Sequence, residues 1–390
     1  MKKKILIIAM VFLLITNNIA FALDGYTDKV KSYLLADYES GEIIDSYNID
    51  TPIELASTSK LLSYFVIKDE ISKGNISYND VIVIDEDTAS ITGSSYKLKA
   101  GEEFTVDKLL KACIIISGND ATYALAKHIA GTEEAFVGLM KKKADSLGLK
   151  SAELYNSSGL PINGLQNKMT TRELYILVRN LLDKYPEVLE LSKTPIISEP
   201  AREFLELNTN PLLRTVENVD GLKTGFTNKA GYCLVSTMNI RGEVGKSEDL
   251  RLIGVVMGAS NFDDRTDASK KILEYGKNNY SKRIILHEKR PIQTLDFKSG
   301  KPNSIQIYPE MSFSKFLLNS TDISLDIKLN DVKPPINQNT YLGQVTVLED
   351  GKPIFTTNLI NKEEVDTVNI LDKIFNFYDI LFRKQNELFK

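Results

Sequence analysis

The chain has 390 residues, of which 43% are hydrophobic and 26% are charged. These are ordinary values for a globular protein, and the length suits two domains. The formal charge of −4, without an arginine cluster, argues against a nucleic-acid partner.

The cysteines and histidines are few. Two histidines, far apart in the sequence, give little material for a histidine-based triad, and we expect neither a metal nor another cofactor. Cys113 and Cys233 lie in apolar segments, where we expect buried thiols. A disulfide between them is the alternative for a protein outside the cell.

Residues 1–22 have the pattern of a signal peptide. Three lysines precede the apolar stretch Ile5–Ile15, and Ala20–Ala22 supplies a small-x-small cleavage pattern. The apolar stretch is short for a membrane span, and an uncleaved anchor is the alternative. The sequence therefore predicts export to the extracytoplasmic face of the cell membrane.

The mature chain should begin with a β-hairpin, in which the strands Ser32–Asp37 and Glu42–Asp45 flank a turn. The apolar run Leu61–Ile67 then predicts a buried helix, with Ser57 and Lys60 at its first turn.

After a short strand, Asp80–Ile84, the spacing of apolar residues predicts four helices. They are Thr105–Ile116, Ala121–Ala130, Glu133–Leu147 and Leu174–Leu182, the last opened by a capping box from Thr170 to Glu173.

A loop-rich stretch with three prolines, from residue 195 to 211, leads to a second group of strands. The expected elements are the strands Gly221–Thr224, Gly231–Thr237 and Leu250–Met257, and a closing helix Arg265–Tyr275. These strands can pair with the hairpin only if both ends of the region meet in one antiparallel sheet. We therefore predict an α+β domain over residues 23–283.

Residues 284–365 are expected to form a small all-β domain. Apolar and polar side chains alternate strictly over Ile323–Leu329, which is typical of a half-buried strand. A turn at Glu349–Lys352 separates two further strands, Gln344–Leu348 and Ile354–Asn358.

The last segment, residues 366–390, predicts an amphipathic helix. Its apolar stripe is Ile370, Leu371, Ile374, Phe375, Tyr378, Leu381 and Phe382. The interspersed charges exclude a spanning helix, and the aromatic stripe indicates a helix that lies on a membrane surface. The alternative is that this helix docks on the β domain.

The sequence Ser57-Thr-Ser-Lys60 could form half of an acyl-transfer site. A spacing of three brings the hydroxyl and the amine together, so that a lysine with a lowered pKa can take the serine proton. The same tetrad also occurs at Ser94–Lys97 and Ser312–Lys315, so it is weak evidence alone.

Two further motifs follow in order. Ser117-Gly-Asn119 follows an apolar helix, where a loop would expose both polar side chains. Lys223-Thr-Gly225 lies on a predicted strand, where the glycine would let a substrate backbone approach closely.

With its three motifs, the chain resembles low-molecular-mass penicillin-binding proteins, the serine-type D-alanyl-D-alanine carboxypeptidases of peptidase family S11, from about Ser32 to Tyr275. The resemblance implies a β-lactamase/transpeptidase-like α/β (α+β) domain with an antiparallel sheet and a helical subdomain, and it matches a following β domain and terminal amphipathic helix. It implies that Ser57 is the acylated nucleophile and Lys60 its general base. Ser117 and Asn119 would relay protons and bind the substrate amide.

The resemblance also implies a substrate-binding group. Lys223 and Thr224 would hold the terminal carboxylate beside Gly225, and Arg265 would help to anchor it. The backbone N–H groups of Ser57 and Phe226 would form an oxyanion hole. Phe226 stands where several relatives carry histidine, which would alter the rate or the pH dependence of deacylation.

The expected activity is removal of the terminal D-alanine from peptidoglycan stem pentapeptides, with β-lactams as covalent inhibitors. One rival is a class A-like β-lactamase, which needs a glutamate on a loop between the second and third motifs; Glu203 and Asn208 are a near miss in spacing. The other rival is a β-lactam sensor or wall-binding module that does not turn over.

Overall fold

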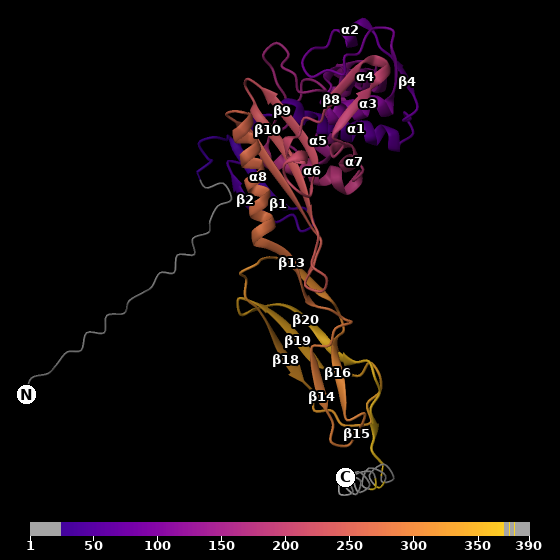
Figure 1. Ribbon diagram of the computed structural model, residues 1–390, viewed down its shortest axis with the longest axis vertical. Coiled ribbons are helices and arrows are strands. Elements are labelled where there is room, and N and C mark those ends of the chain that lie inside the picture. Colours follow the sequence, from indigo (N-terminus) through magenta and orange to yellow (C-terminus); the bar gives the residue numbers. More distant parts are fainter. Residues whose placement is uncertain (1–24, 370–373, 375–377, 379–390) are drawn as a thin grey trace, which may run out of the picture.

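The computed structural model describes residues 25–369 together with Ile374 and Tyr378. In Figure 1 an upper part carries a sheet and the labelled helices, and a narrower lower part consists of strands. The predicted signal peptide, and all but a few residues of the predicted tail helix, lie outside the described residues. Within the described ranges, no helix has the length and hydropathy needed to cross a membrane.

The upper part is built on a five-stranded antiparallel sheet, in the order β2-β1-β12-β10-β9. Its strands are β1 (Ser32–Asp37), β2 (Ile43–Tyr47), β9 (Val219–Thr227), β10 (Gly231–Ile240) and β12 (Leu250–Ala259). Ser32 lies opposite Met257, so the two ends of this region meet in one sheet, as predicted. The pairing of β1 with β2 confirms the expected hairpin.

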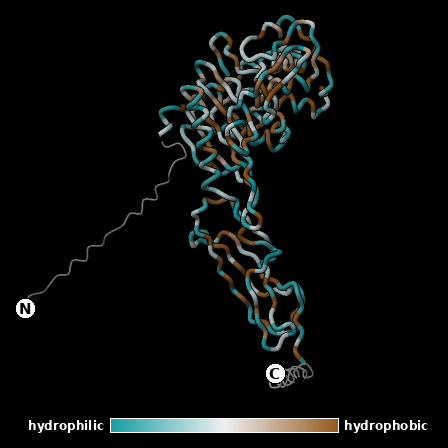
Figure 2. Tube along the Cα trace, viewed as in Figure 1, coloured by the Kyte–Doolittle hydropathy of each residue, from teal (hydrophilic) through white to brown (hydrophobic). Residues whose placement is uncertain are grey.

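Each face of this sheet packs against a different core. Alternation along β1 places Leu34 in the larger core and Leu35 in the smaller one. The helix α8 (Phe262–Asn279) covers the smaller core, and the helices of the middle of the chain cover the larger one. In Figure 2 hydrophobic segments accordingly gather inside the upper part.

Five helices form the layer over the larger core. They are α1 (Lys60–Ser72), α3 (Val106–Ile115), α4 (Asn119–Ala130), α5 (Glu133–Ser146) and α6 (Thr171–Lys184). Every residue of α1 from Lys60 to Glu70 is buried, which confirms the buried helix that the apolar run predicts. The polar head of Lys60 is therefore carried into the protein interior by a core helix.

The predicted capping box at Thr170 is only half formed. The Thr170 hydroxyl accepts the backbone N–H of Glu173 at 3.1 Å. The Glu173 carboxylate, however, accepts the N–H of Ser151, and the Ser151 hydroxyl accepts the N–H of Thr170 at 2.9 Å. A residue from the preceding loop thus replaces the local bond and ties that loop to the start of α6.

The remaining elements of the upper part are short. They are the helices α2 (Glu86–Ala89) and α7 (Val188–Ser192) and three strand pairs, β3 (Pro52–Glu54) with β6 (Lys168–Thr170), β4 (Val81–Val83) with β5 (Glu103–Thr105), and β7 (Ile196–Glu199) with β8 (Phe204–Leu207). The last pair lies in the stretch that we expected to be mainly loop. Pro200 does not interrupt it, because this residue begins the turn between the two strands.

The lower part contains a second five-stranded sheet. Its order is β14 (Gln293–Asp296), β16 (Ser304–Pro309), β20 (Lys352–Asn361), β19 (Tyr341–Glu349) and β18 (Ile323–Leu329), and a short pair joins β15 (Gly300–Lys301) to β21 (Asp366–Thr367). Glu349 pairs with Lys352 at the predicted hairpin turn. The predicted alternating strand is β18, at the sheet edge, and its half-exposed pattern fits that position.

A three-stranded sheet joins the two parts. It consists of β11 (Ser247–Glu248), β13 (Tyr280–Leu286) and β17 (Phe313–Leu318), and β11 belongs to the long loop between β10 and β12. Lys282 on β13 forms ion pairs with Glu39 and Glu248 of the upper part. The sheet therefore spans the expected domain boundary at residue 283.

Candidate active site

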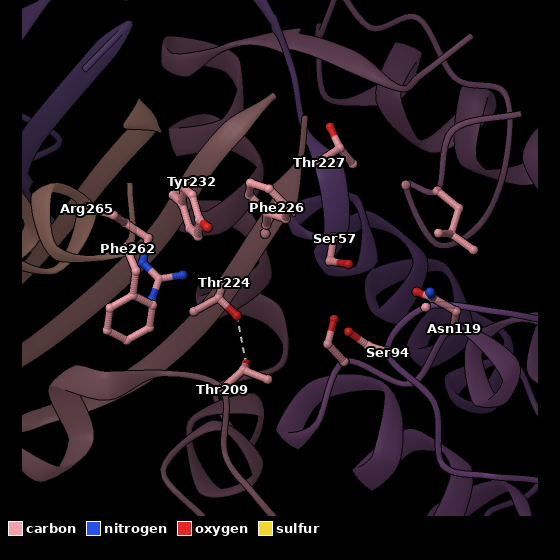
Figure 3. A pocket seen from close by; sticks show the side chains of 15 residues that line it. Ser57, Ser94, Asn119, Thr209, Thr224, Phe226, Thr227, Tyr232, Phe262 and Arg265 are labelled. Atoms are coloured by element: carbon pink, nitrogen blue, oxygen red, sulfur yellow. Dashed lines mark hydrogen bonds between the residues drawn. The ribbon is translucent and has the colours of Figure 1, made fainter. Parts of the chain in front are cut away.

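A pocket lies between β9 and the helical layer (Figure 3). The residues that line it are Ser57, Gly93, Ser94, Ser117, Asn119, Gly159, Leu160, Thr209, Thr224, Gly225, Phe226, Thr227, Tyr232, Phe262 and Arg265. It thus brings together seven of the nine expected site residues. The other two, Lys60 and Lys223, are buried behind its wall, with 0% and 1% of their surface exposed.

Ser57 and Lys60 are brought together by a tight turn. Ser57 lies in a 3₁₀ turn, Ala56–Ser59, and Lys60 begins α1, so the serine precedes the α-helix in which we expected it. Residues three apart nearly eclipse each other in a 3₁₀ turn. A hydrogen bond of 3.0 Å accordingly joins Lys60 Nζ and Ser57 Oγ.

Two further groups hold the Lys60 amine. Its Nζ atom donates to Asn119 Oδ1 at 2.7 Å and to the backbone carbonyl of Ser158 at 2.9 Å. Both partners can only accept hydrogen bonds through these oxygen atoms. A neutral amine has two N–H bonds and one lone pair, so these two acceptors use both N–H bonds and leave the lone pair for the Ser57 hydroxyl.

Burial increases the fraction of Lys60 that is uncharged near neutral pH. Desolvation lowers the pKa of Lys60 from 10.5 to about 8, although Cys113 and Asp120 act in the opposite direction. Burial is thus the physical cause that lowers the pKa of Lys60. The pKa of Lys223 also lies well below its usual value, first because of burial and then because of Lys60.

Ser117 and Asn119 approach from the junction of α3 and α4. Ser117 has a φ of +65°, and its buried Oγ atom has no hydrogen-bond partner among the described residues. The Asn119 amide donates to the carbonyl of Thr92 at 2.8 Å, which fixes its oxygen toward Lys60. The Ser117 hydroxyl is therefore available in the pocket to bind a ligand or pass a proton.

The strand β9 forms the opposite wall. Thr224 Oγ1 donates to Thr209 Oγ1 at 2.7 Å (Figure 3), and Lys223 Nζ donates to the carbonyl of Thr224. A Cβ atom on Gly225 would lie 3.1 Å from the backbone nitrogen of Ser57. A side chain at this position would thus press on the turn that carries Ser57, in addition to hindering the expected approach of a substrate.

Arg265 lies at one end of the pocket among aromatic rings. Its guanidinium is 4.6 Å from the centroid of Phe262 and 5.9 Å from that of Tyr232, whose ring packs at a tilt of 35° against Phe226 (Figure 3). Its Nε and Nη2 atoms are buried without a partner in the described structure, and burial lowers its pKa to about 10. A carboxylate in the pocket would satisfy both donors.

Sequence reasoning missed the loops that complete the pocket, namely Gly93–Ser94, Gly159–Leu160 and Thr209. Ser94 belongs to a second Ser-x-x-Lys tetrad, but its role here is to accept the N–H of Asn119 through its backbone carbonyl. The lysine of that tetrad, Lys97, instead pairs with Glu206. A backbone acceptor of this kind has no side-chain signature in the sequence.

The pocket lining contains no carboxylate. Glu203, the nearest match to the deacylating glutamate of a β-lactamase, is exposed beyond the pocket, and the Asn208 amide is used by the carbonyls of Ser192 and Thr194. His128 lies near Asp80, away from the pocket, and the buried Cys113 and Cys233 are free thiols.

Comparison with known proteins agrees with this geometry. A family model described as D-alanyl-D-alanine carboxypeptidase matches residues 22–261, and a model of the C-terminal domain of penicillin-binding protein 5 matches residues 280–367. D-alanyl-D-alanine carboxypeptidase DacF of Bacillus subtilis is 30% identical over 344 residues, which cover 86% of each chain. DacA of Escherichia coli is 28% identical over 368 residues, which cover 90% of this chain and 87% of DacA.

The solved structures include similar folds. Penicillin-binding protein 5 from Haemophilus influenzae has a TM-score of 0.65 and 28% identity, and the match covers 87% of this chain and 98% of that protein. The ampicillin-bound form of penicillin-binding protein D2 from Listeria monocytogenes has a TM-score of 0.57 and 27% identity over 67% of this chain and 99% of that one.

Proposed function

Because the chain belongs to the D-alanyl-D-alanine carboxypeptidase family of serine peptidases, we propose that it removes the terminal D-alanine of peptidoglycan stem pentapeptides through an acyl-enzyme on Ser57. The serine-type D-alanyl-D-alanine carboxypeptidase activity itself follows from the family. The observation that carries the proposal is the hydrogen-bonded pair of Ser57 and Lys60 at the wall of the pocket.

In the first step, neutral Lys60 takes the proton of Ser57 as its Oγ atom attacks the carbonyl of the penultimate D-alanine. The N–H groups of Ser57 and Phe226 stabilise the tetrahedral oxyanion. The C–N bond then breaks, and the departing D-alanine amine receives the proton by way of Lys60 or Ser117. Water subsequently hydrolyses the acyl-enzyme and regenerates the Ser57 hydroxyl.

The strand β9 supports the alignment of the substrate. It is the edge strand of its sheet, so alternate backbone groups are not used by a neighbouring strand. An extended peptide can pair with such an edge. Thr224 and Arg265 then bind the terminal carboxylate directly, while Lys223 lies behind the pocket wall, where the charge of a bound carboxylate favours its protonated form.

β-Lactams acylate Ser57 as mimics of this substrate under the same proposal. The lack of a carboxylate in the pocket lining argues against the β-lactamase alternative, since that chemistry needs a glutamate to activate water. A sensor or wall-binding module that does not turn over is distinguished by kinetics, because only a carboxypeptidase releases D-alanine repeatedly.

The chain acts outside the cytoplasm, where peptidoglycan lies. We further propose that residues 1–22 direct export, that residues 23–283 and 284–365 form the two domains, and that residues 366–390 bind the membrane surface. The supporting observations are the lysine-led apolar start of the chain and the apolar stripe of its end.

The decisive experiment measures D-alanine release from a synthetic pentapeptide together with the intact mass after penicillin treatment. Ser57→Ala should abolish both D-alanine release and the penicillin adduct. Ser312→Ala, in another Ser-x-x-Lys tetrad, is the matched control and should leave both unchanged. Normal labelling of Ser57→Ala would reject the assignment.

A further inference from the structure

The turn Asn156–Leu160 contacts Lys60 and the 3₁₀ turn that carries Ser57. Its Ser158 carbonyl accepts a hydrogen bond from Lys60 Nζ at 2.9 Å. Its Gly159 packs so closely against the turn of Ser57 that an added Cβ atom would lie 1.8 Å from the carbonyl oxygen of Ala56. The position of this turn therefore determines where the Ser158 carbonyl accepts a hydrogen bond from the Lys60 amine.

The side chain of Asn156 holds the turn from inside. Its Oδ1 atom accepts the N–H groups of Ser158 at 3.1 Å and Gly159 at 2.6 Å, and its Nδ2 atom donates to the carbonyl of Leu160 at 2.7 Å. Only 1% of Asn156 is exposed. The backbone around Ser158 thus depends on one buried amide for its shape.

Asn167 holds the same turn from outside. Its Nδ2 atom donates to the carbonyl of Asn156 at 2.9 Å, and its Oδ1 atom accepts the N–H of Tyr155 at 2.7 Å. Its own carbonyl accepts the N–H of Leu55, two residues before Ser57, at 2.8 Å. Asn167 therefore fixes the position of the turn relative to the segment that leads to the proposed nucleophile.

A second anchor comes from the helical layer. The carboxylate of Glu133, in the first turn of α5, accepts both the N–H and the hydroxyl of Ser157, at 2.9 and 2.6 Å. The Ser63 hydroxyl of α1 donates to the Ser157 carbonyl. The turn is thus held by groups from both sides, although Ser158 contributes only a backbone atom to the site.

We propose that Asn156 and Asn167 are positioning residues, which act through the Ser158 carbonyl to orient the Lys60 amine toward Ser57. Rotation about the Cε–Nζ bond moves the amine lone pair unless both N–H bonds have fixed acceptors. Asn119 supplies one acceptor and Ser158 the other. This inference rests on the proposed role of Lys60 as the base, and it assigns the geometry of that role to two residues outside the three motifs.

The test measures two constants for penicillin in the full-length chain, the dissociation constant of the noncovalent complex and the rate constant of acylation. Asn156→Ala should lower the acylation rate constant 10- to 100-fold, since small misplacements of reacting groups cost about that much, and should change the dissociation constant less than threefold. The endpoint adduct mass gives the folded fraction, so the rate is measured independently of it.

Two variants complete the comparison. Asn156→Ser keeps an uncharged acceptor for the turn and should lose only three- to tenfold in the acylation rate constant. Asn361→Ala removes a fully buried amide that bonds Asn337, Thr340 and Glu363 in the lower sheet region, and should leave the rate constant within twofold.

An acylation rate constant within twofold of the unmodified chain for Asn156→Ala, or a loss that appears only in the dissociation constant, would overturn the inference. Should Asn156→Ala not fold, an unchanged rate constant for Asn156→Ser would do the same. If instead the unmodified chain forms no adduct on Ser57, the proposed function fails rather than the role of the two asparagines.

Discussion

Lys60 and Lys223 lie fully buried beside the same pocket, and within the described residues no carboxylate forms an ion pair with either. Buried cations without a counter-ion are costly. Two consequences follow: the amines lose protons more readily than exposed lysines, and a substrate that brings its own carboxylate is favoured. One pocket therefore combines a base with an anion-binding site.

The first prediction concerns the pH dependence of acylation. If neutral Lys60 is the base, as proposed, burial that lowers its pKa to about 8 means that the second-order rate of acylation by penicillin should rise about tenfold from pH 6 to pH 7 and level off above pH 8. The rate is thus lost as the pH falls through this pKa. Single-turnover measurements between pH 5.5 and 9.5 check this, and a flat profile would contradict the role of Lys60.

The second prediction concerns recognition of the terminal carboxylate. Arg265→Ala should lower kcat/KM for the pentapeptide about 10- to 100-fold, because a hydrogen bond to a charged group contributes roughly 1.5–3 kcal/mol. A pentapeptide with an amidated C-terminus is the control. It should react slowly with the unmodified enzyme and lose little more in the variant. An equal loss for both peptides would show that Arg265 does not bind the carboxylate.

The third prediction compares two glycines of one loop. Gly159 and Gly164 have φ values of +86° and +77°, but an added Cβ atom meets the Ala56 backbone only at Gly159. Gly164→Ala should therefore lower the free energy of unfolding by only about 1 kcal/mol. Gly159→Ala should displace the turn and slow acylation more than about 100-fold. Thermal unfolding and acylation rates test both, and similar acylation rates in the two variants would refute the argument.

Much of this site follows from local sequence. The spacing of Ser57 and Lys60 fixes their contact in any helical turn, and the apolar run after Lys60 indicates that the amine is buried. The sheet was predictable for a different reason: strands at both ends of one α+β region have few ways to pair. Local sequence therefore accounts for the contact of the proposed nucleophile with its proposed base and for the sheet that carries this region.

The remaining features depend on contacts that are distant in sequence. The Ser158 carbonyl and the Thr209 hydroxyl reach the pocket from loops whose course the middle of the chain determines. In the strand pair β7–β8, Leu205 and Leu207 are exposed, so the apolar side chains do not mark a buried face. The sequence of this pair therefore does not distinguish it from a loop. No periodicity encodes such features, because tertiary packing selects them.

The last prediction concerns the end of the chain, where the apolar stripe of residues 370–382 was assigned to a membrane surface from sequence. Deleting Val368–Lys390 should move the exported protein from the membrane fraction to the soluble one. Ile374→Asp adds a charge to the predicted apolar face and should lower binding to anionic lipid vesicles at least tenfold, since burial of that side chain is lost. Asn376→Asp adds the same charge to the polar face and should change binding much less.

Equal losses of vesicle binding in both variants would indicate nonspecific charge repulsion. Unchanged vesicle binding together with a lower melting temperature for Ile374→Asp would show that the segment docks on the β domain instead.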